Sequence, residues 1–269
     1  MTAKKTAVPD LSGINLDELL EAAETVGHIA GDVSLNYFRQ KLDVISKADD
    51  SPVTIADREA ETAMRRYIEE YFPEHGIIGE EHGISNENAR VKWVLDPIDG
   101  TVGFIHGIPL YTNLVGILVD DVPVVGVINA PAMQENVVAA TGKGAFHKGI
   151  KTTLRQPPAL TEASMMTSDV QYFNEYGYKA SFEHLLTLVN THRTWGDAYG
   201  HLMVATGRAD IMLDPVLSIW DAAALLPVIE EAGGVFTDLS GNARVDGGHG
   251  FSAAPGLHES VLSILKTYQ

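Results

Sequence analysis

Cysteine is absent from the 269 residues of this chain. Disulfides, thiolate nucleophiles and sulfur-ligated zinc are therefore excluded, so any metal site must use oxygen ligands or histidine. The absence is compatible with a cytoplasmic location, which we expect. No apolar run approaches the roughly 18 residues that a membrane-spanning helix needs. Residues 1–10 contain two lysines with no apolar run behind them, so we expect no secretory signal.

Basic residues are scarce: 19 lysines and arginines stand against 36 acidic residues, which gives a formal net charge of −17. Such a surface repels nucleic acids and anionic membranes, so we expect neither as a partner. A phosphorylated substrate would also be repelled unless divalent cations reversed the field at the site. Part of the negative charge is therefore interpreted as capacity for binding metal.

The order of the expected elements indicates a layered α+β or α/β architecture. Two amphipathic helices, starting at the capping residues Asn15 and Thr54, precede a meander of antiparallel strands with a hairpin at residues 120–121. Helices and strands alternate in the second half, with helices at 197–206, 220–232 and 258–268. A change in composition at residues 148–158 suggests two halves, 1–150 and 151–269, that form one compact unit.

Residues 93–101, WVLDPIDGT, are the most informative segment. We expect an apolar strand to end in Asp96, with Pro97 fixing a turn and Asp99 following. Two carboxylates at this spacing can converge on hard cations such as Mg²⁺, which prefer oxygen ligands. Backbone N–H groups at Gly100 and Thr101 can bind phosphate if a helix begins there. The alternative is an ordinary Asp-Pro turn followed by an Asp-Gly turn.

Further acidic residues occupy the ends of other expected elements. Glu80 follows the apolar pair at 77–78, whereas Asp57 and Asp221 lie in the first turns of two expected helices. Taken singly, an acid near a helix N-terminus is explained by the helix dipole. None of the ten histidines has the spacing of a helical metal site, and we expect His106 to serve packing or lie on the surface.

The chain resembles the inositol monophosphatase family of magnesium-dependent phosphatases. The resemblance is carried by residues 79–81 (GEE), 93–101, 220–223 (WDAA) and 231–234 (EAGG), and it extends from about residue 19 to 265. It implies an αβαβα sandwich with the metal site between the two halves, and a homodimer.

The resemblance also implies roles for individual residues around two or three Mg²⁺ ions. Glu80, Asp96 and the backbone carbonyl of Ile98 would hold one ion. Asp96, Asp99 and Asp221 would hold a second, and a weaker third ion would lie near Glu80. The remaining roles fall to residues that activate water or contact the substrate: Asp57 and Thr101, assisted by Glu80, for the water; Gly100 and Thr101 for the phosphate; and Lys47 near the entrance.

The substrate is expected to be a small phosphorylated alcohol, and two further acids indicate which one. Asp197, within the WGDAYG run at 195–200, and Asp214 are both acidic, and the resemblance implies that both positions face the leaving group. Because paired carboxylates favour a cationic ligand, an amino alcohol such as histidinol fits, and the run resembles the histidinol-phosphatase branch of the family. Alternatively, Asp197 caps a helix and Asp214 fixes a turn. The other candidates are an inositol-1-monophosphatase, a broad sugar-phosphate phosphatase and a non-catalytic binding or regulatory module.

Overall fold

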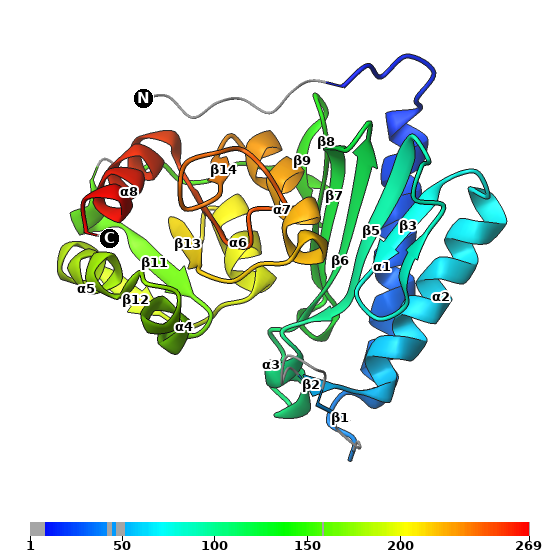
Figure 1. Cartoon of the computed structure of the whole chain (residues 1–269), viewed down its shortest axis with the longest axis horizontal. Coiled ribbons are helices and arrows are strands. Elements are labelled where there is room, and N and C mark those ends of the chain that lie inside the picture. Colours follow the sequence, from blue (N-terminus) through cyan, green and yellow to red (C-terminus); the bar gives the residue numbers. More distant parts are fainter. Residues whose placement is uncertain (1–8, 42–44, 47–51, 158, 269) are drawn as a thin grey trace.

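The computed structural model describes residues 9–41, 45–46, 52–157 and 159–268 (Figure 1). The helices are α1 (Leu16–Tyr37), α2 (Ile55–Tyr71), α3 (Thr101–Ile105), α4 (Val170–Glu175), α5 (Lys179–Leu188), α6 (Ala198–Ala205), α7 (Ile219–Glu231) and α8 (Pro255–Thr267). The strands are β1 (Ile45–Ser46), β2 (Pro52–Val53), β3 (Gly76–Gly79), β4 (Gly83–Ser85), β5 (Val91–Asp99), β6 (Thr112–Val119), β7 (Val122–Ala130), β8 (Glu135–Ala140), β9 (Gly144–His147), β10 (Ile150–Thr152), β11 (Ser164–Thr167), β12 (Thr191–Arg193), β13 (Ile211–Asp214), β14 (Val235–Thr237) and β15 (Gly250–Ala253).

The two helices expected at the start of the chain are confirmed. The side chain of Asn15 accepts a hydrogen bond from the amide of Glu18, and that of Thr54 accepts one from Ala56, so both N-termini are capped. Both helices bury their apolar faces against the central strands of the first sheet, with Val26 and Met64 fully buried there. Figure 1 shows them side by side on one face of that sheet.

The first sheet has eight strands in the order β10-β9-β8-β7-β6-β5-β3-β4. Neighbouring strands are antiparallel except β3 and β5, which run parallel. The predicted hairpin between β6 and β7 is confirmed, because Asp120 and Asp121 have φ angles of 50° and 64° that suit a tight turn between twisted strands.

The expectation that the strand at Trp93 ends before Pro97 is wrong. Strand β5 continues to Asp99, and it accommodates the proline through an irregularity in its pairing with β6. Asp96 lies opposite Leu114 and Asp99 opposite Thr112, so three steps along β5 match two along β6. Such a bulge tolerates proline and redirects side chains, which is why bulges are common beside active sites.

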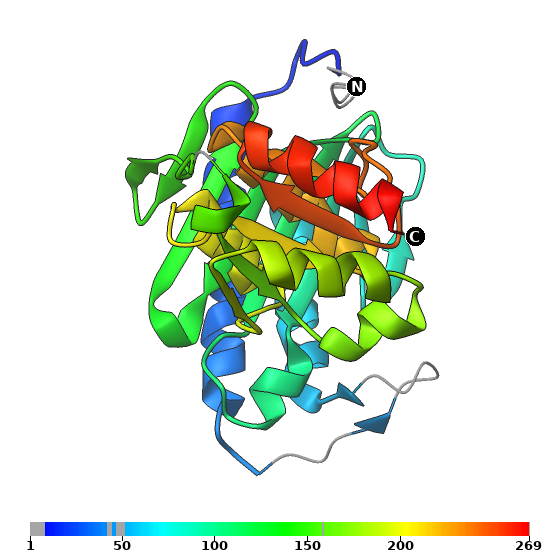
Figure 2. The ribbon, with the colours of Figure 1, turned by 90° about the vertical axis from the view of Figure 1, so that its left-hand side faces the viewer.

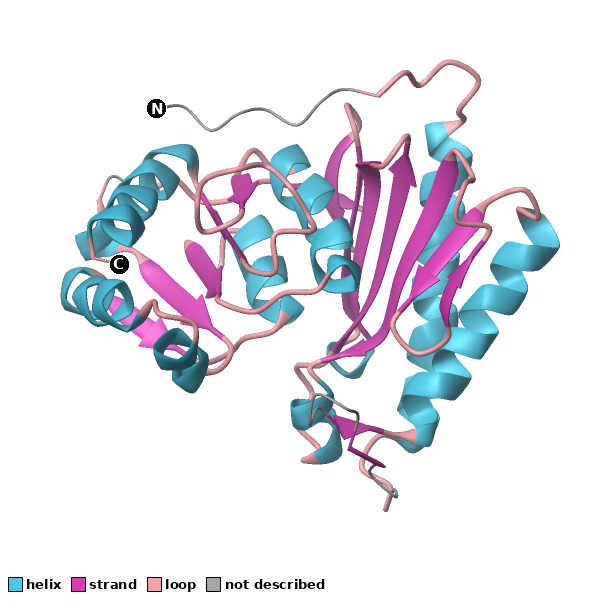
Figure 3. Cartoon of the chain, viewed as in Figure 1, coloured by secondary structure: helices cyan, strands magenta, loops and turns pink. Residues whose placement is uncertain are grey.

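The second sheet has five strands in the order β12-β11-β13-β15-β14 and is mixed. β11 runs parallel to both β12 and β13, whereas β15 is antiparallel to its neighbours. Helices α6 and α7 lie between the two sheets, and residues of both belong to the buried core there, including Leu202 and Leu225 (Figure 3). Helices α5 and α8 cross the outer face of the second sheet (Figure 2). The layers therefore run α-β-α-β-α, as the resemblance implied.

No helix in the described part of the chain is both long enough and apolar enough to cross a membrane.

Candidate active site

The bulge in β5 presents two carboxylates at the edge of a cleft between the two sheets. The side chain of Asn113 donates to the carbonyl of Pro97 at 2.6 Å and in turn accepts from Asn129, which fixes the irregular backbone. Asp96 is buried, and its carboxylate accepts from the amide of Ile98 at 3.0 Å. A rigid backbone therefore holds the two carboxylates, as the sequence predicted, although the backbone forms a bulge in a strand instead of a turn after it.

A third carboxylate arrives from α7. Asp221 lies in the first turn, where its carboxylate accepts from the amide of Ser218 at 2.6 Å in a capping box. Oxygen atoms of Asp96, Asp99 and Asp221 lie within 4.8 Å of one another, close enough for a shared metal ion. The predicted convergence of Asp221 with Asp96 and Asp99, which lie more than 120 residues before it in sequence, is found in the structure.

Glu80 and Asp57 lie near this acidic centre: Glu80 follows β3, and Asp57 is on α2 and is not among the residues that line the cleft. Glu80 lines the cleft. Burial is the largest cause of the raised pKa of Asp96, and the negative charge of Glu80 is the second largest. Asp57 is buried in the first turn of α2, where its carboxylate accepts from the amide and the hydroxyl of Thr54. Burial raises the pKa of Asp57 although those hydrogen bonds oppose the shift, and Glu80 adds to it.

Thr101 is the first residue of α3, and Gly100 before it has φ 78°, which suits glycine. The helix that the sequence analysis required at this point is therefore present. The hydroxyl of Thr101 donates to the carbonyl of Ile98 at 3.0 Å. The partnership of Thr101 with Asp57 stays a prediction.

The cleft has a volume of about 560 Å³ and is strongly acidic. Among the described residues that line it there is no lysine, arginine or histidine. The acids are seven: Glu80, Asp96, Asp99, Asp169, Asp197, Asp214 and Asp221. Burial and mutual repulsion raise the pKa of Asp96 and Asp99 well above the usual range, that of Asp221 to about 8 and that of Asp197 to about 7. An all-oxygen set whose charges repel when no cation is present fits a site for hard divalent ions.

Asp197 occupies the position before α6, yet its side chain makes no capping hydrogen bond. The amide of Ala198 donates instead to Asp99 at 2.8 Å. Asp197 lies against Gly100: a Cβ atom there would be 2.8 Å from its carboxylate oxygen. Capping therefore does not explain Asp197, whose carboxylate lies beside Gly100.

Asp214, at the end of β13, is buried and held by two protein partners. Its carboxylate accepts from the hydroxyl of Ser168 at 2.5 Å and lies 3.2 Å from Nε2 of His201, whose Nδ1 lies 2.8 Å from the hydroxyl of Ser252. Ser168 and His201 were not predicted, because their contacts join segments 13 to 51 residues apart. Ser168 follows the apolar pair at 165–166 by two positions, and this is the one signal in the sequence that indicates a strand end.

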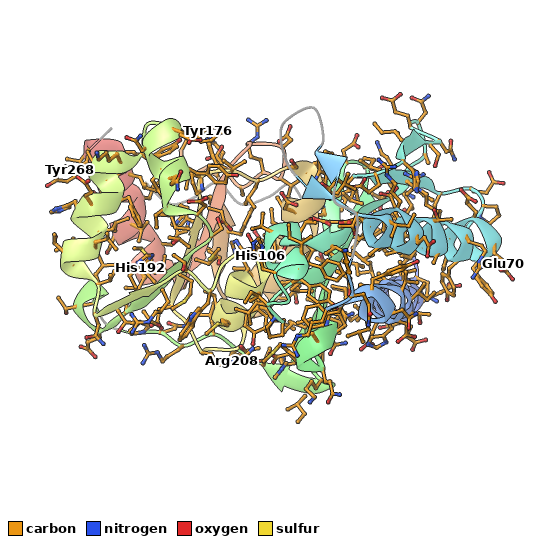
Figure 4. The ribbon with its side chains drawn as sticks, turned by 90° about the horizontal axis from the view of Figure 1, so that it is seen from below. Glu70, His106, Tyr176, His192, Arg208 and Tyr268 are labelled. Carbon is orange, nitrogen blue, oxygen red and sulfur yellow. The ribbon has the colours of Figure 1, made fainter. Side chains whose placement is uncertain are left out.

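Asp169 and Tyr172 were also missed and line the cleft from the start of α4. His106 ends α3 and is exposed, with Nδ1 2.8 Å from the carbonyl of Val102, so it lies on the surface (Figure 4). Lys47 lies outside the described residues, so its expected place near the entrance stays a prediction.

Comparison with known proteins agrees with this geometry. A model of the inositol monophosphatase family matches residues 15–269. The histidinol-phosphatase of Chlorobaculum parvum is 38% identical over 87% of this chain and 91% of its own, and that of Mycobacterium tuberculosis is 37% identical over 83% and 88%. The solved inositol monophosphatase of Zymomonas mobilis superposes with a TM-score of 0.83 at 33% identity, over 93% of this chain and 98% of that one. The chain therefore belongs to the inositol monophosphatase family of phosphoric monoester hydrolases.

Proposed function

We propose that the chain is a Mg²⁺-dependent histidinol-phosphate phosphatase, which hydrolyses L-histidinol phosphate to L-histidinol and phosphate in histidine biosynthesis. The observation that carries this proposal is the surplus of acids in a cleft without a described basic side chain. Glu80, Asp96, Asp99 and Asp221 suffice for the metals, which leaves three further acids. Asp169 is exposed and caps α4, whereas the carboxyl groups of Asp197 and Asp214 are buried. Buried carboxylates without a counter-charge are unfavourable, so this pair favours a cationic substrate.

The metal ligands would be Glu80, Asp96 and the Ile98 carbonyl for one ion, and Asp96, Asp99 and Asp221 for the second, with a third ion near Glu80. When bound, Mg²⁺ neutralises charge on the phosphoryl oxygens and makes a water more acidic. The amides of Gly100 and Thr101 would orient the phosphate at the start of α3.

Asp57 and Thr101 would handle the proton of the attacking water. The water oxygen would form a bond to phosphorus while the ester bond breaks, and the Asp57 carboxylate would take the proton; for Thr101 to relay it, its hydroxyl would turn from the Ile98 carbonyl to which it donates. A pKa raised by burial makes Asp57 a stronger base than an exposed aspartate. The leaving alkoxide would take a proton from solvent water and leave as the alcohol, and Asp57 would return its proton to solvent.

Asp197 and Asp214 would bind the ammonium group of histidinol. Asp197 makes no capping hydrogen bond and lies beside the phosphate-binding glycine, whereas Asp214 is held by Ser168 and His201 and adds chiefly its charge. The relatives from Chlorobaculum parvum and Mycobacterium tuberculosis are both named histidinol-phosphatases, which supports this substrate. We also propose a cytoplasmic homodimer in which residues 1–150 supply most metal ligands and 151–269 supply substrate recognition.

The alternative is an inositol-1-monophosphatase or broad sugar-phosphate phosphatase, favoured by solved neighbours such as the Zymomonas mobilis enzyme. Phosphate release from histidinol phosphate and from inositol-1-phosphate, each with and without Mg²⁺, separates the two. A Mg²⁺-dependent preference for histidinol phosphate supports the proposal. Preference for inositol-1-phosphate would keep the metal site and overturn the role of Asp197.

A further inference from the structure

Glu61 lies one turn beyond Asp57 on α2, and its side chain is fully buried. Both of its carboxylate oxygens are engaged. Oε2 accepts from the amide of Glu81 at 2.6 Å, and Oε1 accepts from the amide of His82 at 3.2 Å and from Nε of Arg65 at 2.7 Å. A buried carboxylate that accepts from two successive amides fixes the backbone that carries them.

Those amides belong to the segment that presents the metal ligand Glu80. The amide of Glu80 donates to the carbonyl of Leu95 at 3.2 Å, directly before Asp96 on β5. The next two amides along the chain are the ones that Glu61 binds. Arg65 continues the attachment, because its guanidinium also donates to the carbonyl of Gly83. The turn between β3 and β4 is therefore held by β5 on one side of Glu80 and by α2 on the other.

Gly79, at the end of β3, shows how tightly the carboxylate of Glu61 fits. A Cβ atom at this position would lie 2.0 Å from Oε1 of Glu61, well inside the distance of any allowed contact. Glycine is needed here because the carboxylate already fills the space that a side chain would occupy. The glycine of the GEE motif is thus explained by Glu61.

We propose that Glu61 is a positioning residue for the metal site, which acts through the backbone at residues 80–82 to aim Glu80 at Asp96. Residues 57, 61 and 65 recur every four positions, so they share one face of α2. That face carries Asp57, the proposed base, and one turn further Glu61, which supports the proposed metal ligand Glu80. The inference rests on the proposed role of Glu80 as a ligand.

The test is Mg²⁺ binding to the metal-free protein, measured by isothermal titration calorimetry, in wild type and Glu61→Gln. Partners that orient metal ligands typically contribute 10- to 100-fold in metal affinity, so we expect weakening of about that size. The Mg²⁺ concentration for half-maximal phosphate release should rise in parallel, with KM for the ester unchanged at saturating Mg²⁺.

Asp210→Asn is the matched control. Asp210 is also a fully buried acid, which accepts from Nε of Arg155 at 2.9 Å and from the amide of Ser164 at 2.7 Å; it lies directly before β13 and does not line the cleft. Both substitutions should lower Tm, because both remove the charge of a buried, arginine-paired acid. Equal Mg²⁺ affinity in the two variants would reduce Glu61 to a structural ion pair and overturn the proposal.

Two further variants keep the outcomes distinct. Glu80→Gln must itself weaken Mg²⁺ binding; if it does not, the proposed metal site is wrong rather than the role of Glu61. Gly79→Ala leaves every charge in place, but its methyl group would displace the Glu61 carboxylate. It therefore tests the position of that carboxylate without changing its charge. It also provides a test if Glu61→Gln fails to fold. We expect weaker Mg²⁺ binding in Gly79→Ala, and wild-type affinity there would contradict the positioning role.

Discussion

One carboxylate oxygen of Asp99 accepts a hydrogen bond of 2.8 Å from the backbone amide of Ala198. The same oxygen accepts from the hydroxyl of Thr112 at 2.9 Å, so a metal-ligand candidate on β5 also caps α6 in the other half of the chain. Because Asp99 supplies the cap, the carboxylate of Asp197 is not needed to cap α6. The backbone of Asp197 has φ 54° and ψ −162°, a conformation nearly restricted to glycine.

We expect Asp197→Gly to be more stable than Asp197→Ala. Both remove the carboxylate and differ only in a Cβ atom at a strained position. Such strain is worth about 1–3 kcal/mol, against about 0.4–1 kcal/mol for the greater entropy of an unfolded glycine chain. Urea unfolding should therefore give the glycine variant a free energy of unfolding higher by about 1 kcal/mol. A more stable alanine variant would show that the backbone is relaxed here.

Asp197→Ala should raise KM for histidinol phosphate much more than KM for inositol-1-phosphate. On the proposed binding mode, the lost charge would face the ammonium of histidinol phosphate, whereas inositol-1-phosphate carries no cation. A charge-assisted contact is worth about 1.5–3 kcal/mol, so the selective rise should be about 10- to 100-fold. Steady-state kinetics with both esters at saturating Mg²⁺ measures it, and equal changes for both esters would contradict the proposed ammonium site.

Asp96→Asn should abolish most turnover while the fold is retained. Asparagine keeps the shape of the side chain but removes an anionic ligand that both proposed ions share. Since partners of metal ligands alone contribute about 10- to 100-fold, loss of the ligand should lower kcat more than about 100-fold. Circular dichroism and Tm without metal provide the control, because removing one of several repelling charges should leave Tm unchanged or higher. Retained turnover would remove Asp96 from the metal site.

The helices at Asn15 and Thr54 and the β6–β7 hairpin follow from local signals, namely capping residues and a two-residue turn, so the sequence predicted them. The bulge at Asp96–Asp99 was not predicted, because a register shift is a relation between two strands and cannot be recognised in the sequence of either strand alone. Helix α4, six residues long, shows too little periodicity to be recognised. The acids that converge with Asp221 were predicted from motifs, whereas Ser168 and Glu61 became visible only through contacts between distant segments.

The stability of the metal-free protein should fall as pH rises from 5 to 8. The pKa of Asp221 is raised to about 8 and that of Asp197 to about 7, above the ordinary value of 3.8 for both. Between about pH 4 and 8 the folded state thus binds more protons than the unfolded state, and stability decreases with pH. Unfolding in EDTA should show a shallower decrease for Asp221→Asn than for wild type. Added Mg²⁺ should raise Tm more at pH 8 than at pH 5, because its ligands must be deprotonated; the reverse order would contradict the shifted carboxylates.

His258 should produce the opposite dependence at lower pH, away from the cleft. It is buried on α8, stacks on Phe251 at 4.1 Å between ring centres, and lies 2.8 Å from the hydroxyl of Thr237. That hydroxyl donates to the carbonyl of Asp238, so Nε2 of His258 carries a hydrogen and donates to the hydroxyl. Burial lowers the pKa of His258 from 6.5 to about 4.

As pH falls from 6.5 towards 4, the unfolded chain therefore binds a proton at His258 that the folded chain does not bind, and the free energy of unfolding decreases. Each pH unit in that window corresponds to about 1.4 kcal/mol. Between pH 7 and pH 5, wild type should lose about 2 kcal/mol more free energy of unfolding than His258→Gln, which cannot titrate. Denaturant unfolding of both proteins at the two pH values, with saturating Mg²⁺ to hold the carboxylates ionised, measures this difference. Equal losses in the two proteins would mean that the imidazole is charged in the folded state.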